Sequence, residues 1–261
     1  MKASIIICTY NEEKTIKDVL TACCEFNPDC EIIVIDDGST DNTENILKKV
    51  SEKYSFRYER LRKNMGKSWA MAHGVEISVN EIILFFDADV SNIKKEHFNE
   101  ILKPIADNTA DMVLGQPSET LIDYRINPFK PLTGERALLK NDIVPVLNEI
   151  RDIRFGVETF INLYYQAQGK RIKYVLLNEL KHPSTFEKTG SMHIATKKYL
   201  KEGKEIATTI LNNHSLINQR IEYLICKTNN NAKGKIIELQ NEINIKLQDF
   251  KNKTDKLFEE I

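Results

Sequence analysis

The chain has 261 residues, with 37 Lys plus Arg against 38 Asp plus Glu, which gives a formal net charge of -1 at pH 7. This balance argues against a dedicated nucleic-acid binder, and a 41% share of apolar residues argues against global disorder. No apolar run approaches the ~20 residues of a membrane helix, and the five cysteines lack paired spacing, so we expect a cytoplasmic protein without a transmembrane segment.

The first part of the chain alternates strand-like and helix-like segments. Short apolar runs that end in polar turn residues predict buried strands at 4–8, 31–35, 56–60 and 81–86. Apolar residues at helical spacing predict helices at 12–24, around Ile46, Leu47 and Val50, and at 68–78. This alternation predicts parallel pairing and an α/β sheet, in which ligands bind at the carboxyl ends of the strands.

After residue 110 the pattern is less regular. We expect strands at 111–115 and 171–177, a polar loop at 117–131, and helices at 137–149 and 158–168, the former interrupted at Pro145. From residue 194 the chain is predicted to be mostly helical, and a break at 229–234 separates off a tail.

The tail carries a seven-residue repeat, formed by Ile236, Ile243, Phe250 and Leu257. Leu247 and Ile261 occupy the interleaved position, which polar Gln240 and Thr254 interrupt. Such a narrow apolar stripe is typical of a coiled coil and is marginal as an isolated helix. We therefore predict a homo-oligomer formed through 236–261. A helix folded back on its own domain and an interfacial helix that attaches the protein peripherally to a membrane remain alternatives.

Three predicted strands end in polar clusters. After the first, Thr9, Tyr10 and Glu12 provide a hydroxyl, an aromatic face and a carboxylate that can stack a base and bond its edge, although a helix cap explains them equally. After the second comes Asp37, which can accept a hydrogen bond from a base or ribose, although a turn and cap also account for its surroundings.

The most apolar strand ends in Asp87-Ala88-Asp89. Carboxylates are the ligands that Mg²⁺ and Mn²⁺ prefer, and these ions commonly bridge one or two carboxylates to substrate phosphates. The sequence therefore predicts a divalent cation at this strand end.

Together these motifs resemble those of GT-A fold glycosyltransferases, especially family 2. The matching segments are 9–13, 36–39, 64–67 and 87–89, followed by 132–137 and 155–158. The chain is similar to the glucosyl-3-phosphoglycerate synthases and to bacterial enzymes of the dolichyl-phosphate-mannose-synthase type. The resemblance implies a Rossmann-like α/β domain over 1–210, with a donor half at 1–115 and an acceptor half at 116–210, followed by a helical extension at 211–261.

The resemblance also implies an activity, namely metal-dependent transfer of a hexosyl group from a UDP- or GDP-sugar to an acceptor that stays unidentified. The implied donor-binding residues are Thr9, Tyr10, Glu12, Asp37, Lys67, Asp87, Ala88 and Lys188. The implied acceptor-binding residues are Gly134, Glu135 and Arg136, the metal ligands Asp87, Asp89 and His182, and the catalytic residues Glu158 and Asp89.

Alternatives remain for single residues and for the function. His182 could be a surface histidine before Pro183, and Lys188 a solvated charge. A sugar-nucleotide-binding or scaffold protein without turnover is one alternative function. A sugar nucleotidyltransferase is another, although it should carry a glycine-rich loop after the first strand, and no glycine precedes Gly38. The same absence argues against a dinucleotide oxidoreductase.

Overall fold

The structure is a computed structural model. It describes residues 2–119, 133–153, 156–183 and 203–227 and, in the tail, Gly234, Ile237, 240–242, 244–246 and Gln248.

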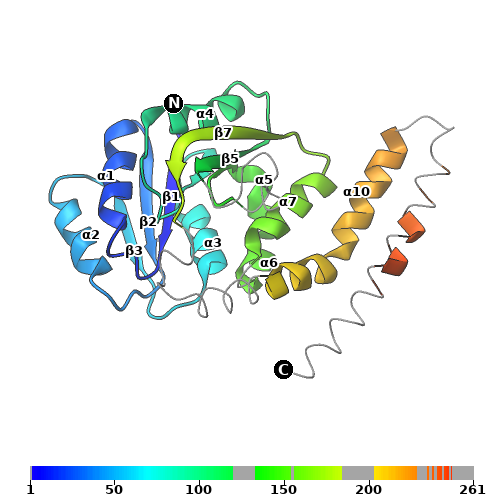
Figure 1. Cartoon of the computed structure of the whole chain (residues 1–261), viewed down its shortest axis with the longest axis horizontal. Helices are drawn as coiled ribbons and strands as arrows, with labels where there is room; N and C mark the ends of the chain where they lie inside the picture. Colours follow the sequence, from blue (N-terminus) through cyan, green and yellow to red (C-terminus); the bar gives the residue numbers. More distant parts are fainter. Residues whose placement is uncertain are drawn as a thin grey trace.

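In the described part of the chain, a seven-stranded sheet forms the centre of the molecule, in the order β3-β2-β1-β4-β6-β5-β7 (Figure 1). Its strands are β1 (Ser4–Thr9), β2 (Glu31–Asp36), β3 (Arg57–Arg60), β4 (Ile82–Phe85), β5 (Met112–Glu119), β6 (Arg136–Leu139) and β7 (Ile172–Lys181). The strands β3, β2, β1 and β4 pair in parallel, β6 is antiparallel to both β4 and β5, and β7 is parallel to β5. The predicted α/β sheet is confirmed, and it is mixed.

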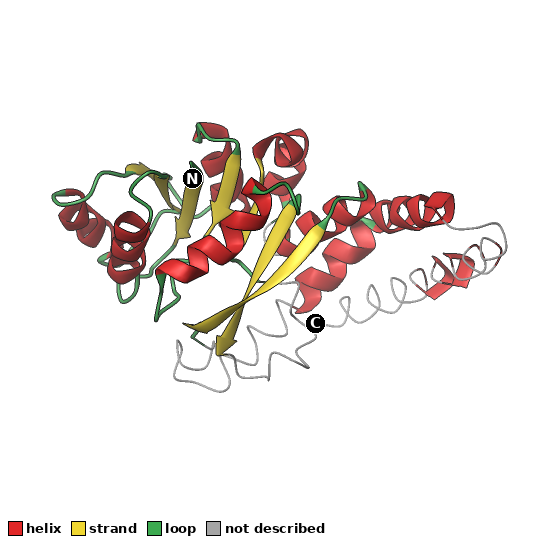
Figure 2. Ribbon diagram, turned by 90° about the horizontal axis from the view of Figure 1, so that it is seen from above, coloured by secondary structure: helices red, strands yellow, loops and turns green. Residues whose placement is uncertain are grey.

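Helices cover both faces of the sheet, as the view in Figure 2 shows. They are α1 (Ile16–Phe26), α2 (Thr43–Ser51), α3 (Lys67–Ile77), α4 (Lys95–Ala106), α5 (Lys140–Ile143), α6 (Leu147–Asp152), α7 (Val157–Ala167) and α10 (His214–Lys227), with a 3-10 turn at Val144–Val146 and further helix at 203–212. Among the described residues, no helix combines the length and hydropathy that a membrane span requires.

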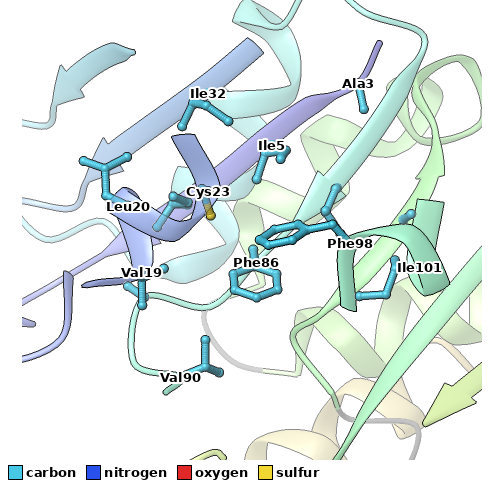
Figure 3. Close-up of a cluster of buried hydrophobic side chains, with 14 of the residues drawn as sticks. Ala3, Ile5, Val19, Leu20, Cys23, Ile32, Phe86, Val90, Phe98 and Ile101 are labelled. Carbon is cyan, nitrogen blue, oxygen red and sulfur yellow. The ribbon is translucent and has the colours of Figure 1, made fainter. Parts of the chain in front are cut away.

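The alternation of strand side chains produces two cores. In β1, Ile5 and Ile7 face the core formed with α1, α2 and α4, whereas Ile6 faces the core formed with α3, α6 and α7. On the first side Phe86 stacks on Phe98 of α4 with ring centroids 4.9 Å apart, as Figure 3 shows. Burial on both faces explains why the strands are nearly continuous apolar runs.

The predicted helix at 137–149 is wrong over its first residues. Residues 136–139 form β6, which lies between β4 and β5, and the chain becomes helical only at Lys140. Ala137 and Leu138 are buried on opposite faces of the sheet. A strand buried on both sides has no polar alternation, so its periodicity resembles that of a buried helix.

Other boundaries also differ from the prediction. The strand β5 continues to Glu119, into the expected loop, and the remainder of that loop lies outside the described residues. The strand β7 extends to Lys181 rather than ending at residue 177, and α4 was not predicted. Most of the predicted coiled coil at 236–261 lies outside the described residues.

Candidate functional site

Two acids and a histidine converge where β4 ends. The Nε2 atom of His182, which directly follows β7, lies 3.3 Å from Asp87 Oδ2 and 3.4 Å from Asp89 Oδ1. One potential ligand atom from each residue lies within 4.8 Å of the others. Two carboxylates and an imidazole form a donor set that suits a divalent cation, so the residues present fit the predicted metal.

A raised pKa at His182 offsets the negative charge of the two carboxylates. Burial lowers the pKa of His182, but its hydrogen bond with Asp87 and the charges of Asp89 and Glu135 outweigh this effect and raise the pKa to about 10. Burial raises the pKa of Asp87, yet the charge of Lys67 and the bond with His182 hold that pKa far below its usual range. The raised pKa of His182 favours an imidazolium between the two carboxylates, and a cation that bound its Nε2 atom would displace that proton.

Lys67 joins this cluster to α7. Its Nζ atom lies 2.8 Å from Asp87 Oδ1 and 2.9 Å from Glu158 Oε1. Burial lowers the pKa of Lys67, but the charges of Asp87 and Glu158 raise it well above its ordinary value. The predicted donor-binding lysine and the predicted catalytic acid, 91 positions apart in the sequence, thus form one ion-pair network.

Asp37 supports the turn before Lys67. Its Oδ1 accepts a hydrogen bond from the Met65 backbone N–H at 2.6 Å, and its Oδ2 accepts one from the Gly66 N–H at 2.8 Å. Gly66 has a φ of 100°, which glycine adopts readily. Burial raises the pKa of Asp37 despite these two bonds. Its carboxylate therefore fixes the start of α3, and with it the position of Lys67.

The segment after β1 is pinned to the segment after β2. The Asn11 side chain accepts a bond from the Thr40 N–H at 2.8 Å, and the Glu12 N–H donates to Thr43 Oγ1 at 3.0 Å. Thr9 is buried and its Oγ1 atom has no hydrogen-bond partner in the described part of the chain. The Tyr10 ring is 43% exposed and so is accessible for stacking.

The predicted acceptor residues lie inside the fold. A Cβ atom on Gly134 would stand only 2.0 Å from Asp87 Oδ2, so the backbone of Gly134 packs directly on that carboxylate. Glu135 and Arg136 have no exposed surface, and burial raises the pKa of Glu135 to about 7.

Arg136 connects three neighbouring segments through hydrogen bonds. It donates to Thr133 O at 2.6 Å, to Glu158 O at 3.4 Å and to Asn162 Oδ1 at 3.4 Å. Its bond to the Glu158 carbonyl links β6 with the start of α7. Nothing in the local sequence indicated that Arg136 is buried and makes this link.

The remaining predicted residues have different outcomes. The Ala88 side chain faces the core, which leaves its backbone as the part that a ligand could meet. Lys188 lies outside the described residues. Sequence reasoning missed Arg60, which pairs with buried Asp36 at 3.4 Å and donates to Ser39 O at 2.7 Å, holding the end of β2.

Comparisons with known proteins place the chain among sugar transferases. The family described as Glycosyl transferase family 2 matches residues 4–203. Poly-beta-1,6-N-acetyl-D-glucosamine synthase from Staphylococcus epidermidis is 34% identical over 87 residues, which are 33% of this chain and 21% of that protein. Cholesterol galactosyltransferase from Borreliella burgdorferi is 30% identical over 147 residues, 52% of this chain and 40% of that protein. The chain thus spans less than half the length of either relative.

Solved structures share the fold. TarS from S. aureus has a TM-score of 0.60 at 19% identity, covering 86% of this chain and 71% of that chain. Glucosyl-3-phosphoglycerate synthase from Mycobacterium tuberculosis, in complex with Mn²⁺, UDP and phosphoglyceric acid, has a TM-score of 0.60 at 20% identity, covering 80% and 77%. Another TarS structure is a complex with UDP. These similarities confirm the predicted fold.

Proposed function

The chain belongs to glycosyl transferase family 2, and we propose that it transfers a hexosyl group from a UDP-sugar to an acceptor, assisted by a divalent cation. The observation that carries this proposal is the convergence of Asp87, Asp89 and His182 beside the ammonium group of Lys67. Transfer from a nucleoside diphosphate sugar leaves a diphosphate, whose developing negative charge needs positive groups held in place. UDP in complexes of two proteins with this fold supports UDP over GDP.

Asp87, Asp89 and His182 would hold Mg²⁺ or Mn²⁺, which supplies Lewis-acid stabilisation of the diphosphate when bound. To hold the cation His182 would have to be neutral, and Asp87 would be shared between the cation and Lys67. Lys67, freed in part from Asp87, contacts the donor phosphates as a mobile point charge.

Glu158 is the proposed general base. Its carboxylate lies at the start of α7 and pairs with Lys67, and a carboxylate in this position is proposed to accept the proton of an acceptor hydroxyl. This role applies where transfer inverts the configuration at the sugar, whereas a retaining route leaves Glu158 as a partner of Lys67 only.

The nucleoside half is proposed to bind over the segment after β1. The exposed ring of Tyr10 provides a stacking face, and the buried Thr9 Oγ1 offers an unused hydrogen-bonding group. Glu12 stays a proposed donor contact. Asp37 acts on the donor through the turn that carries Lys67. Lys188 stays a proposed diphosphate contact.

Glu135 and Arg136 are buried, which supports a structural role beside Asp87 and Glu158 in place of direct contact with the acceptor.

The test is a donor screen. The protein is incubated with UDP-glucose, UDP-galactose, UDP-N-acetylglucosamine and GDP-mannose, with Mn²⁺ or with EDTA, and released nucleotide is measured. We expect UDP release that requires Mn²⁺, that is absent in Asp89→Ala, and that persists in Asp29→Ala, which changes an exposed acid. Release of GDP instead would reassign the donor. Mn²⁺-dependent UDP-sugar binding without release, even with mixed acceptors, would favour a binding protein without turnover.

A further inference from the structure

The end of β7 departs from a regular strand just before His182. Between Pro117 and Glu119 of β5, the partner strand β7 advances from Leu177 to Lys181, so β7 contains extra residues at this point. This irregularity, called the bulge below, resembles a β-bulge, which bends a strand and redirects the side chains after it. At its centre Glu179 has a φ of +67°, in the left-handed region that residues other than glycine seldom occupy.

The bulge changes which side chains share a face. Leu177 and Leu180 are both without exposed surface and belong to the same core. Residues three apart on a regular strand point to opposite faces, so the alternation is reversed between them. On a regular strand Lys181 would share the side of Leu177. With the bulge, Leu180 takes that side, and His182 reaches the two acids.

Hydrogen bonds that do not involve Asp87, Asp89 or His182 hold the bulge to the loop that follows Asp89. Ser91 and Lys181 exchange backbone hydrogen bonds of 2.9 and 3.1 Å. The Asn92 side-chain amide donates to the Glu179 carbonyl at 2.9 Å, and Lys94 Nζ donates to Glu179 Oε2 at 2.5 Å. The Glu179 N–H donates to Ser118 Oγ at 2.7 Å.

His97 completes this set of contacts from the start of α4. The Lys94 N–H donates to its Nδ1 at 3.1 Å, which leaves Nε2 as the donor to Asn178 O at 2.8 Å. His97 is 2% exposed. Hydrogen bonds therefore join the bulge to both ends of the 91–97 segment, at Ser91 and at His97.

We propose that Glu179 is a positioning residue, whose left-handed backbone sets where His182 meets Asp87 and Asp89 and thereby fixes the geometry of the cation site. The inference rests on the proposed function in so far as these three residues bind a divalent cation. The backbone conformation carries the effect, and the Glu179–Lys94 pair, exposed on both sides, contributes little.

Two substitutions at one position separate these contributions. Glu179→Val disfavours the left-handed backbone because its side chain is β-branched, whereas Glu179→Gly permits it and removes only the carboxylate. Lys94→Gln is the matched control for the ion pair. The readouts are Mn²⁺ affinity in the presence of UDP, UDP affinity in EDTA, and the thermal unfolding midpoint.

We expect E179V to bind Mn²⁺ about tenfold to a hundredfold more weakly, as for other residues that orient metal ligands. E179G and K94Q should stay within about twofold of the native protein, and UDP affinity in EDTA should be unchanged in all three. Should E179V not fold, Glu179→Ala provides the comparison with E179G.

Two results overturn the inference. One is native-like Mn²⁺ affinity in folded E179V. The other is a loss in E179G equal to that in E179V, which would assign the effect to the carboxylate. A parallel fall of UDP affinity in EDTA also counts against it, because it indicates general damage. If the native protein itself binds no Mn²⁺ with UDP, the proposed function fails first, and the native control reports that separately.

Discussion

Lys67 and Glu158 form a 2.9 Å ion pair that joins the first turn of α3 to the first turn of α7. The same ammonium group lies 2.8 Å from Asp87. One ammonium group therefore connects the proposed general base with a proposed metal ligand, across the proposed donor and acceptor halves of the chain.

Replacing Lys67 should damage donor binding and turnover together. Lys67→Met leaves two largely buried carboxylates without their shared cation, and the unpaired charge of a broken buried pair is costly. We expect UDP affinity to fall by a factor on the order of ten and turnover to fall by about a hundredfold, measured by calorimetry and nucleotide release.

Lys63→Met is the control for that substitution, since Lys63 is exposed and makes no ion pair in the described part of the chain. Native-like UDP affinity in Lys67→Met would remove Lys67 from the donor site.

Mn²⁺ binding should release a proton. The pKa of His182 is raised to about 10 in the metal-free protein, so the ring is charged at neutral pH and must lose its proton to coordinate. Calorimetry in buffers of different ionisation enthalpy should show about one proton released per Mn²⁺ near neutral pH, and none in His182→Gln. Equal heats in all buffers would exclude the imidazolium.

The same group affects stability in a defined direction. Because the folded pKa of His182 lies above its unfolded value, its stabilising interaction is complete below about pH 6.5 and is lost as the pH rises through about 10. Without metal, the excess unfolding free energy of the native protein over His182→Gln should therefore shrink between neutral and alkaline pH. A difference that grows with pH contradicts the assignment.

Gly134→Ala should disturb the site through one methyl group. The new Cβ would lie 2.0 Å from Asp87 Oδ2, so the carboxylate or the β6 backbone must move. We expect a loss of about 1–3 kcal/mol in unfolding free energy, as in overpacked cores, together with weaker Mn²⁺ binding.

Gly203→Ala is the matched control, because no atom of the described residues lies within 4 Å of its added Cβ. In the helix at 203–212 that change should stabilise by about 0.5–1 kcal/mol. Unaltered Mn²⁺ affinity in Gly134→Ala would mean that Asp87 is not held by this contact.

Self-association through the tail stays a prediction of the seven-residue repeat at 236–261. Light scattering should show a dimer or larger assembly for the full chain and a monomer for a version that ends at Asn231, with donor binding unchanged. Monomers in both cases would favour a helix folded back on its own domain.

The sequence predicted well which polar clusters lie together, because parallel strands bring their carboxyl ends to one edge of the sheet. The clusters after β1, β2 and β4 therefore needed only three correct strands to be placed together. The location of His182 beside the two acids was harder to predict from the sequence, because it depends on the bulge at Glu179. Residues 177–182 contain no local pattern that indicates a change of alternation.

The acceptor side was harder to predict for a different reason. The strand β6 is buried on both faces and has the composition of a buried helix, so its antiparallel insertion was missed. Without that strand, Glu135 and Arg136 fell between the predicted loop at 117–131 and the predicted helix at 137–149. Their burial follows from a long-range pairing that a local pattern does not report.

The reversed direction of β6 has a consequence for how such a protein can diversify. Because β5 is parallel to β4 and β6 runs against both, the connection between β5 and β6 begins and ends at the edge that carries Asp87. Its length and sequence can therefore change without altering the sheet pairs Met112–Leu138, Val113–Ala137 or Leu114–Arg136. An insertion at this junction would change what lies beside Asp87, Asp89 and His182 without changing those residues. In the proposed enzyme, acceptor preference can therefore evolve separately from cation binding.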